Sequence, residues 1–130
     1  MYLLDTNTLI YFFKGQGRVG ERLLATPPRQ VGLSAIVLHE LETGIAKSAQ
    51  PEKRRTQLES LVRVAALFPF GKAEAAASAL IRAELECSGT PIGPLDNLIA
   101  GTAVANQMIL VTHNTQEFSR VSNLTLADWY

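Results

Sequence analysis

The stretch from Met1 to Phe13, MYLLDTNTLIYFF, determines how the rest of the chain is organised. Residues 2–5 are predicted to form a strand buried on both faces, which is typical of a central strand in a parallel sheet. Asp5 ends the apolar run, and Thr6 and Asn7 follow as residues that favour helix N-termini. Apolar residues then resume at helical spacing. Asp5 is therefore expected at the carboxyl end of a buried strand, where open α/β sheets bind ligands.

The length of the chain is that of an ordinary domain. It has 130 residues, of which 47% are hydrophobic, and its formal net charge is zero. Residues 43–82 carry seven basic and three acidic side chains, whereas residues 83–130 carry five acidic and one basic. This asymmetry fits a side that faces a polyanion together with an acidic site, and it equally fits a mixed surface.

The chain shows no sign of secretion or membrane insertion. Its single cysteine, Cys87, excludes an internal disulfide, as is usual in a reducing compartment. The apolar run at the N-terminus is much shorter than a signal segment or a membrane span. We therefore expect a cytoplasmic protein that does not contact a membrane.

Predicted strands alternate with predicted helices along the whole chain. Further strands are expected at residues 31–33, 108–111 and, at an edge, 124–126, while Pro69 restricts residues 67–70 to a connector or an edge strand. Helices are expected at residues 7–14, 19–25, 35–48, from Pro51, at 72–87 and from Pro94. This order predicts an α/β fold with a parallel sheet in a single domain, residues 1–130.

Helical phase separates two acidic residues in the helix that follows Ser34. Glu40 lies four residues from Ile36 and three from Val37, on the apolar face of that helix. Glu42 is two residues further on, about 200° round the helix at ~100° per residue. Glu40 is thus predicted to point inward and Glu42 outward. A carboxylate on a buried face must be paired, protonated or bound to metal.

Several acidic residues share one expected edge of the sheet, and each has a purely structural alternative. Asp5 could only cap a helix, Glu40 could pair with an arginine, Asp96 could only favour the start of its helix, and Glu117 could be a surface residue. Together, three converging carboxylates raise each other's pKa, which a hard divalent cation relieves. Mg²⁺ or Mn²⁺ suits oxygen ligands, whereas the sequence offers neither a zinc ligand set nor a phosphate-binding glycine motif.

Four segments in series carry a resemblance to a known family: LLDTNTLI, HELETGIAKS, GTPIGPLDNLIAGTA and ILVTHNTQEFSRV. The chain resembles the PIN-domain endoribonucleases and, more narrowly, the VapC toxins of bacterial type II toxin–antitoxin systems. The resemblance covers nearly the whole chain. It implies a three-layer α/β/α sandwich around a twisted, mainly parallel sheet, and an Mg²⁺- or Mn²⁺-dependent endoribonuclease. It also implies a homodimer and a VapB-like antitoxin as partner.

The resemblance assigns roles residue by residue. Three residues match the acids that hold the metal in the family: Asp5, Glu40 and Asp96. Asn7 matches the polar residue after the first acid, and Thr112 is expected to support the site by hydrogen bonding. Asn114 stands where the family pattern has a fourth aspartate, so Asn114 or Glu117 completes the site.

The implied substrate is RNA, with tRNA ahead of rRNA. Five basic residues are candidates for contacts with its backbone: Lys47, Lys53, Arg54, Arg55 and Arg63. A catalytically inactive PIN fold that only binds RNA or a partner is one alternative, although the acids are intact. A haloacid-dehalogenase-type phosphatase is another, because DTNTL is similar to a DxDxT motif. That motif needs a second aspartate where this chain has Asn7, and the later lysine is missing.

Overall fold

The computed structural model describes all residues from 1 to 130, and at its centre is one five-stranded sheet. All neighbouring strands pair in parallel, in the order β3-β2-β1-β4-β5. The strands are β1 (Tyr2–Leu4), β2 (Val31–Ser34), β3 (Ala66–Phe68), β4 (Ile109–Val111) and β5 (Leu126–Ala127). The predicted central position of the first strand is confirmed, and Leu3 and Leu4 are buried in the core.

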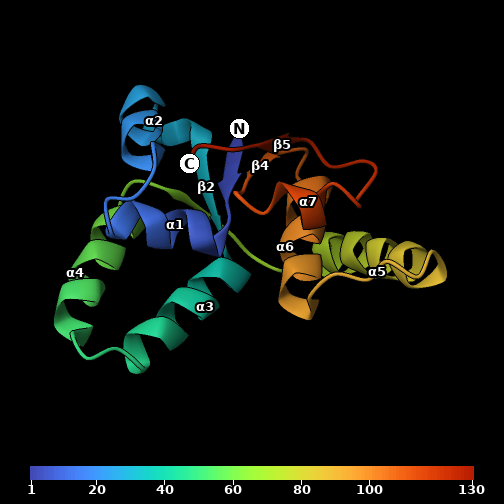
Figure 1. The fold of residues 1–130 in the computed structure, drawn as a ribbon, viewed down its shortest axis with the longest axis horizontal. Coiled ribbons are helices and arrows are strands. Elements are labelled where there is room, and N and C mark those ends of the chain that lie inside the picture. The colour runs from blue at the N-terminus through green and yellow to red at the C-terminus, as the bar shows by residue number, and fades with distance from the viewer.

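Helices cover both faces of this sheet. Figure 1 shows α1, α2 and α4 on one side of the strands and α5 and α6 on the other, which confirms the three-layer α/β/α architecture. None of the helices has the length and apolar content needed to cross a bilayer. The helices are α1 (Thr6–Phe13), α2 (Val19–Ala25), α3 (Ala35–Ala46), α4 (Pro51–Val62), α5 (Lys72–Cys87), α6 (Pro94–Ala105) and α7 (Thr115–Phe118).

Several element boundaries differ from the sequence prediction by one or two residues. The first helix begins at Thr6 because the N-cap is Asp5, not Thr6 or Asn7: the Asp5 carboxylate accepts a hydrogen bond from the Thr6 backbone N–H. Residues 66–68 form an edge strand, so the alternative of a plain connector is wrong. The last strand covers residues 126–127 rather than 124–126.

The helices on one side of the sheet pack unusually closely. A Cβ atom at Gly101 of α6 would lie 2.5 Å from the Cβ of Ser78 in α5, so only glycine fits at this crossing. The buried Asn97 amide also donates a hydrogen bond to the Ser78 carbonyl, at 2.9 Å. This crossing holds α6, and therefore the residues at its N-terminus, in a fixed position against the sheet.

Hydrogen bonds to one backbone carbonyl tie the carboxyl end of β1 to that of β4. The Asp5 backbone N–H donates to the Val111 carbonyl at 2.9 Å, and the Thr8 hydroxyl donates to the same carbonyl at 3.1 Å. The start of α1 is thereby joined to the end of β4, although about one hundred residues separate them in sequence.

Candidate active site

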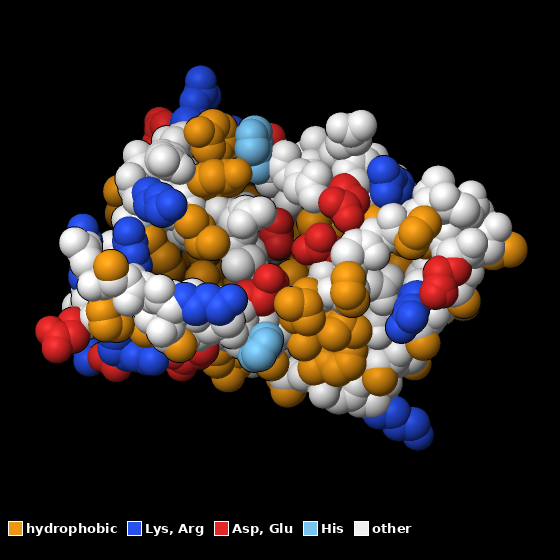
Figure 2. Space-filling view, turned by 60° about the horizontal axis from the view of Figure 1, so that its bottom comes forward, with side chains coloured by type: hydrophobic (Ala, Val, Ile, Leu, Met, Phe, Trp, Pro, Cys, Tyr) orange, Lys and Arg blue, Asp and Glu red, His pale blue; other side chains and the backbone are white.

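Acidic side chains gather in a hollow at the carboxyl edge of the sheet. Figure 2 shows them on the floor of a depression between two lobes of the molecule. Four different elements supply the acids that act electrostatically on one another: Asp5 at the end of β1, Glu40 in α3, Asp96 in α6 and Glu117 in α7. The structure therefore brings together all four acids selected from the sequence.

Asp5 is the most buried of the four, with 4% of its surface exposed. One carboxylate oxygen accepts the Thr6 N–H at 2.8 Å and the other accepts the Thr112 hydroxyl at 2.9 Å. Burial raises the pKa of Asp5, and the charges of Glu40 and Glu117 add to this rise, whereas the two hydrogen bonds oppose it. The carboxylate is thus held in one orientation in an environment that disfavours its charge.

Glu40 and Glu42 lie in different surroundings, as helical phase predicts. An oxygen of Glu40 accepts the Thr6 hydroxyl at 2.7 Å, which ties α3 to the first turn of α1 beside Asp5. Glu42 instead forms a half-exposed ion pair with Arg55 of α4, at 2.6 Å. The alternative of an arginine partner therefore applies to Glu42 and not to Glu40.

Asp96 lies in the first turn of α6, and the absence of a side chain at Gly93 makes room for its carboxylate. A Cβ atom at Gly93 would come within 3.0 Å of an Asp96 oxygen. Burial raises the pKa of Asp96 to about 6, and the negative charges of Asp5, Glu117 and Glu40 contribute to the rise. A carboxyl group with such a pKa gains more than an ordinary one from a nearby cation.

Glu117 and Asn114 act as a pair. The Asn114 side-chain amide donates to one Glu117 oxygen at 2.8 Å, and the Gly93 N–H donates to the other at 3.1 Å. These two hydrogen bonds lower the pKa of Glu117, in contrast to Asp5 and Asp96. Asn114 also donates its backbone N–H to the Thr112 hydroxyl, at 3.1 Å. Asn114 and Glu117, the two candidates for the fourth position of the site, are thus hydrogen-bonded to each other, and Glu117 supplies the carboxylate.

The contacts of Asn7 and Thr6 differ from those that the sequence suggested. Asn7 is exposed and forms no hydrogen bond with any of the acids, so no hydrogen bond supports the role predicted for it. Thr6, predicted only as a cap, joins two acids because its N–H binds Asp5 and its hydroxyl binds Glu40. The DTNT spacing contains no signal that separates these two roles, since either residue could serve as a cap.

The donor set suits a hard divalent cation, although no three side chains form a ready-made ligand cluster. The donors are all carboxylate oxygens, which Mg²⁺ and Mn²⁺ favour. No hydrogen bond offsets the rise in the pKa of Asp96, and only one oxygen of Glu40 is occupied. Rotation of the longer glutamate side chains would be needed to bring the oxygens around one ion.

An apolar groove opens beside the acidic hollow, between α1, α3 and α4. It has a volume of about 300 Å³, and Glu40, Lys14 and Arg54 are its charged lining residues. Figure 2 shows lysine and arginine side chains spread over the lobe to the left of the hollow. Of the basic residues chosen from the sequence, Arg55 is engaged with Glu42 and Arg54 donates to Gln57.

Comparison with known proteins gives consistent results for sequence and structure. The PIN domain model matches residues 2–124. The tRNA(fMet)-specific endonuclease VapC of Shigella flexneri is 37% identical over 129 residues, covering 98% of this chain and 97% of the relative. VapBC2 from Rickettsia felis, solved on a DNA fragment from its promoter, superposes with a TM-score of 0.92 at 33% identity, covering 99% and 98% of the two chains. DNA-bound VapBC from Salmonella typhimurium gives 0.92 at 35% identity, with the same coverage.

Proposed function

The chain belongs to the PIN-domain family, as a VapC-type ribonuclease toxin, and from this premise we propose that its four clustered acids form an Mg²⁺- or Mn²⁺-dependent centre for cutting tRNA. PIN-domain ribonucleases generally depend on divalent metal ions. Membership of this family rules out the phosphatase alternative. The names and structures of the relatives identify an endoribonuclease that a VapB-type antitoxin neutralises.

The observation that carries the proposal is the convergence of Asp5, Glu40, Asp96 and Glu117 from four elements. Burial raises the pKa of Asp5 and Asp96, and repulsion between the acids adds to this rise, so the acids destabilise one another in the absence of a cation. A fold that only binds RNA would gain nothing from a negative cluster, because the cluster repels phosphates. The arrangement therefore favours catalysis over the alternative of an inactive binding module.

Asp5, Asp96 and Glu40 would hold the ion, directly or through water. When bound, the ion would supply the positive charge that activates a water for in-line attack and offsets charge developing on the phosphate. Thr112 and Thr6 fix the Asp5 carboxylate, so that its oxygens need no reorganisation during the reaction. Glu117, which Asn114 and Gly93 keep ionised, would orient the attacking water.

The RNA backbone would lie across the hollow, with its phosphates toward the basic lobe. Lys47, Lys53 and Arg63 are the basic candidates whose side chains form neither an ion pair nor a hydrogen bond, because Arg55 pairs with Glu42 and Arg54 donates to Gln57. We place tRNA first and rRNA second, because the Shigella relative is named as a tRNA endonuclease. Folded RNA of this kind is recognised through loops and shape. The site of action would be the cytoplasm, where both RNAs are found.

The groove between α1, α3 and α4 is where we place the antitoxin. Its apolar lining would accept the nonpolar face of a helix, and Glu40 at its end would attract an inserted arginine. Such a segment would cover the acidic hollow and exclude RNA.

We also propose that the toxin acts as a homodimer, each copy being a single domain that spans residues 1–130.

The decisive experiment compares Asp5→Asn with the unsubstituted chain. The purified protein, free of antitoxin, is incubated with total RNA and Mg²⁺ or Mn²⁺, and the products are tested for 5′-phosphate and 3′-hydroxyl ends. We expect cleavage that EDTA and Asp5→Asn both abolish, and that Glu42→Gln, a matched acid-to-amide change outside the cluster, leaves in place. Cleavage that survives EDTA or Asp5→Asn contradicts the metal site. Binding of RNA without any cleavage would favour the inactive module.

A further inference from the structure

A cluster of aromatic rings stands beside the acidic hollow, and the proposed reaction does not use it. The His113 imidazole stacks on the Tyr130 ring, with centroids 4.3 Å apart and planes 22° apart. Tyr11 of α1 meets both rings edge-on, at 5.9 Å from His113 and 4.8 Å from Tyr130. Three distant segments of the chain therefore contribute to one stack.

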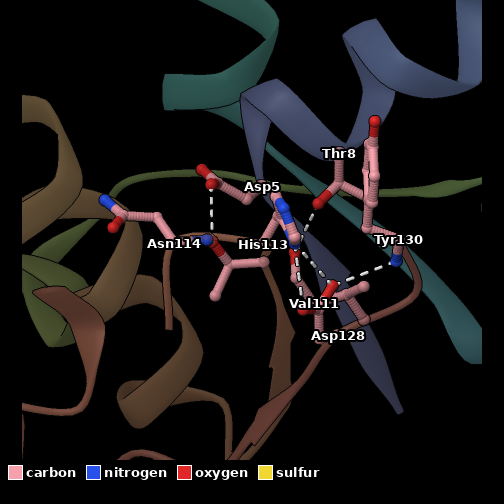
Figure 3. Close-up of polar contacts among 8 residues, drawn as sticks. Asp5, Thr8, Val111, His113, Asn114, Asp128 and Tyr130 are labelled. Atoms are coloured by element: carbon pink, nitrogen blue, oxygen red, sulfur yellow. Dashed lines mark hydrogen bonds and ion pairs between the residues drawn. The ribbon is translucent and has the colours of Figure 1, made fainter. Parts of the chain in front are cut away.

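Polar contacts hold this stack in a single orientation. His113 Nδ1 lies 3.0 and 3.2 Å from the two carboxylate oxygens of Asp128, and the Tyr130 backbone N–H donates to the same carboxylate at 3.0 Å. Figure 3 shows Asp128 joining both residues in this way. Gly17, with φ of +65°, lies against the Tyr130 ring so closely that a Cβ atom there would come within 2.8 Å of it. The rings are thus fixed without being part of the core.

The His113 and Tyr130 rings are far more exposed than the neighbouring aromatic side chain of Trp129. The neighbouring residue Trp129 is 6% exposed and packs against Tyr2, so it belongs to the core. Tyr130 is 46% exposed, and the His113 side chain is also 46% exposed. Gly17 and His113 both lie against the Tyr130 ring, and both members of the stack keep exposed surface. An exposed, rigidly held ring contributes little to stability and is available to a ligand.

The position of the stack links it to the acids. His113 lies between Thr112, which holds Asp5, and Asn114, which holds Glu117. The exposed Arg18 is also close, because its backbone N–H donates to the Tyr130 carbonyl at 3.0 Å. A nucleotide next to one bound at the acids would thus meet a flat ring with a cationic residue close by.

We propose that the His113–Tyr130 stack is a platform for an unpaired base of the RNA substrate, adjacent to the phosphate that is cut. This inference rests on the proposed ribonuclease function and adds a base-binding position to it. Unpaired bases of RNA are commonly held by stacking on histidine and tyrosine rings. Any base offers a flat face, so the platform favours single-stranded over paired RNA more than it favours one base.

Two substitutions at His113 separate stacking from hydrogen bonding. His113→Gln keeps a polar side chain of similar length without a ring, and His113→Phe keeps a ring without the nitrogen that faces Asp128. Each is made in the full chain that carries Asp5→Asn, so that a synthetic RNA stem-loop is bound and not cut. His39→Gln, at the other exposed histidine, is the matched control.

We expect His113→Gln to weaken binding of the stem-loop by about fivefold or more, since stacking on one ring is worth about 1–3 kcal/mol per base. His113→Phe should recover most of that loss, and His39→Gln should leave the affinity unchanged. With the cleaving chain, His113→Gln should raise KM more than it lowers kcat. Replacing the loop bases by abasic sites should remove the difference between the Gln and Phe variants.

The outcomes distinguish this inference from the function on which it rests. If the unsubstituted chain cuts RNA and His113→Gln binds the stem-loop equally well, the platform is refuted and the ribonuclease stands. If His113→Phe binds as weakly as His113→Gln, the nitrogen matters and the stacking role is refuted. If the unsubstituted chain neither binds nor cuts RNA, both proposals fail.

Discussion

Replacing Asp96 with asparagine is expected to stabilise the metal-free protein while it removes a carboxylate from the active site. The pKa of Asp96 is raised from 3.8 to about 6, chiefly by burial and then by the charges of Asp5, Glu117 and Glu40. The folded state at neutral pH therefore holds a charge that the unfolded state accommodates better. Asparagine has nearly the same shape and removes that charge.

The size of the effect follows from the pKa shift. A rise of about two pKa units corresponds to about 3 kcal/mol, because one unit is worth 1.36 kcal/mol. Asp96 is only half-buried, so solvent screening reduces the gain to about 1 kcal/mol. Asp96→Asn should thus raise the free energy of unfolding at pH 7 by this amount.

The effect has a defined pH dependence. Between pH 4 and pH 6 the folded protein binds a proton at Asp96 that the unfolded chain has released, so the folded state gains stability as the pH falls. The advantage of Asp96→Asn should therefore be largest above pH 6 and should shrink toward zero near pH 4. An ordinary, lowered carboxyl pKa would give the opposite trend.

Urea denaturation followed by circular dichroism, at pH 7 and pH 5 in EDTA, measures this difference. Glu117→Gln is the matched control, because hydrogen bonds from Asn114 and Gly93 lower the pKa of Glu117. Neutralising Glu117 should fail to stabilise the protein at pH 7. Addition of Mg²⁺ should stabilise the unsubstituted chain more than Asp96→Asn. An Asp96→Asn protein no more stable than the unsubstituted chain at pH 7 would refute the electrostatic reasoning.

Three further substitutions test other parts of the structure. Glu40→Gln should reduce RNA cleavage far more than Glu42→Gln, since Glu42 only forms a surface pair with Arg55; equal losses in a cleavage assay would contradict the assignment. Thr112→Val removes a hydrogen bond to the buried Asp5 carboxylate, so thermal unfolding at pH 7 should show a loss of about 1–3 kcal/mol that Thr112→Ser largely avoids. Gly101→Ala should destabilise the α5–α6 crossing by about 1–3 kcal/mol, whereas Gly44→Ala, which enters open space in α3, should stabilise by up to about 1 kcal/mol; urea midpoints that move together would argue against this packing.

Local patterns predicted the elements and the acids they carry. Tyr2 to Leu4 formed the expected central strand because a short apolar run without alternation suits a strand covered on both faces. Helical phase placed Glu40 and Glu42 on different sides of α3, since the rotation per residue is fixed. These features depend on neighbours within one turn or one strand, which the sequence displays directly.

Contacts between distant segments could not be predicted in the same way. Asp5 and Thr112 are 107 residues apart, and Gly93 and Glu117 are 24 apart. Nothing in the DTNT spacing reveals that Thr6 reaches Glu40 while Asn7 faces solvent, because this depends on where α3 lies. The stack of His113 on Tyr130 is likewise made by the path of the last residues across the end of β4.

The strand order has a consequence for the making of the protein. One neighbour of the central strand β1, the strand β2, is synthesised early, whereas the other, β4, begins only at Ile109. A nascent chain that already contains Asp5, Glu40 and Asp96 thus lacks both the strand that completes the sheet and the threonine that orients the first acid. Long-range parallel pairing of this kind forms slowly and late. The ribosome that translates this nuclease therefore finishes almost the entire chain before a competent active site exists beside its own RNA.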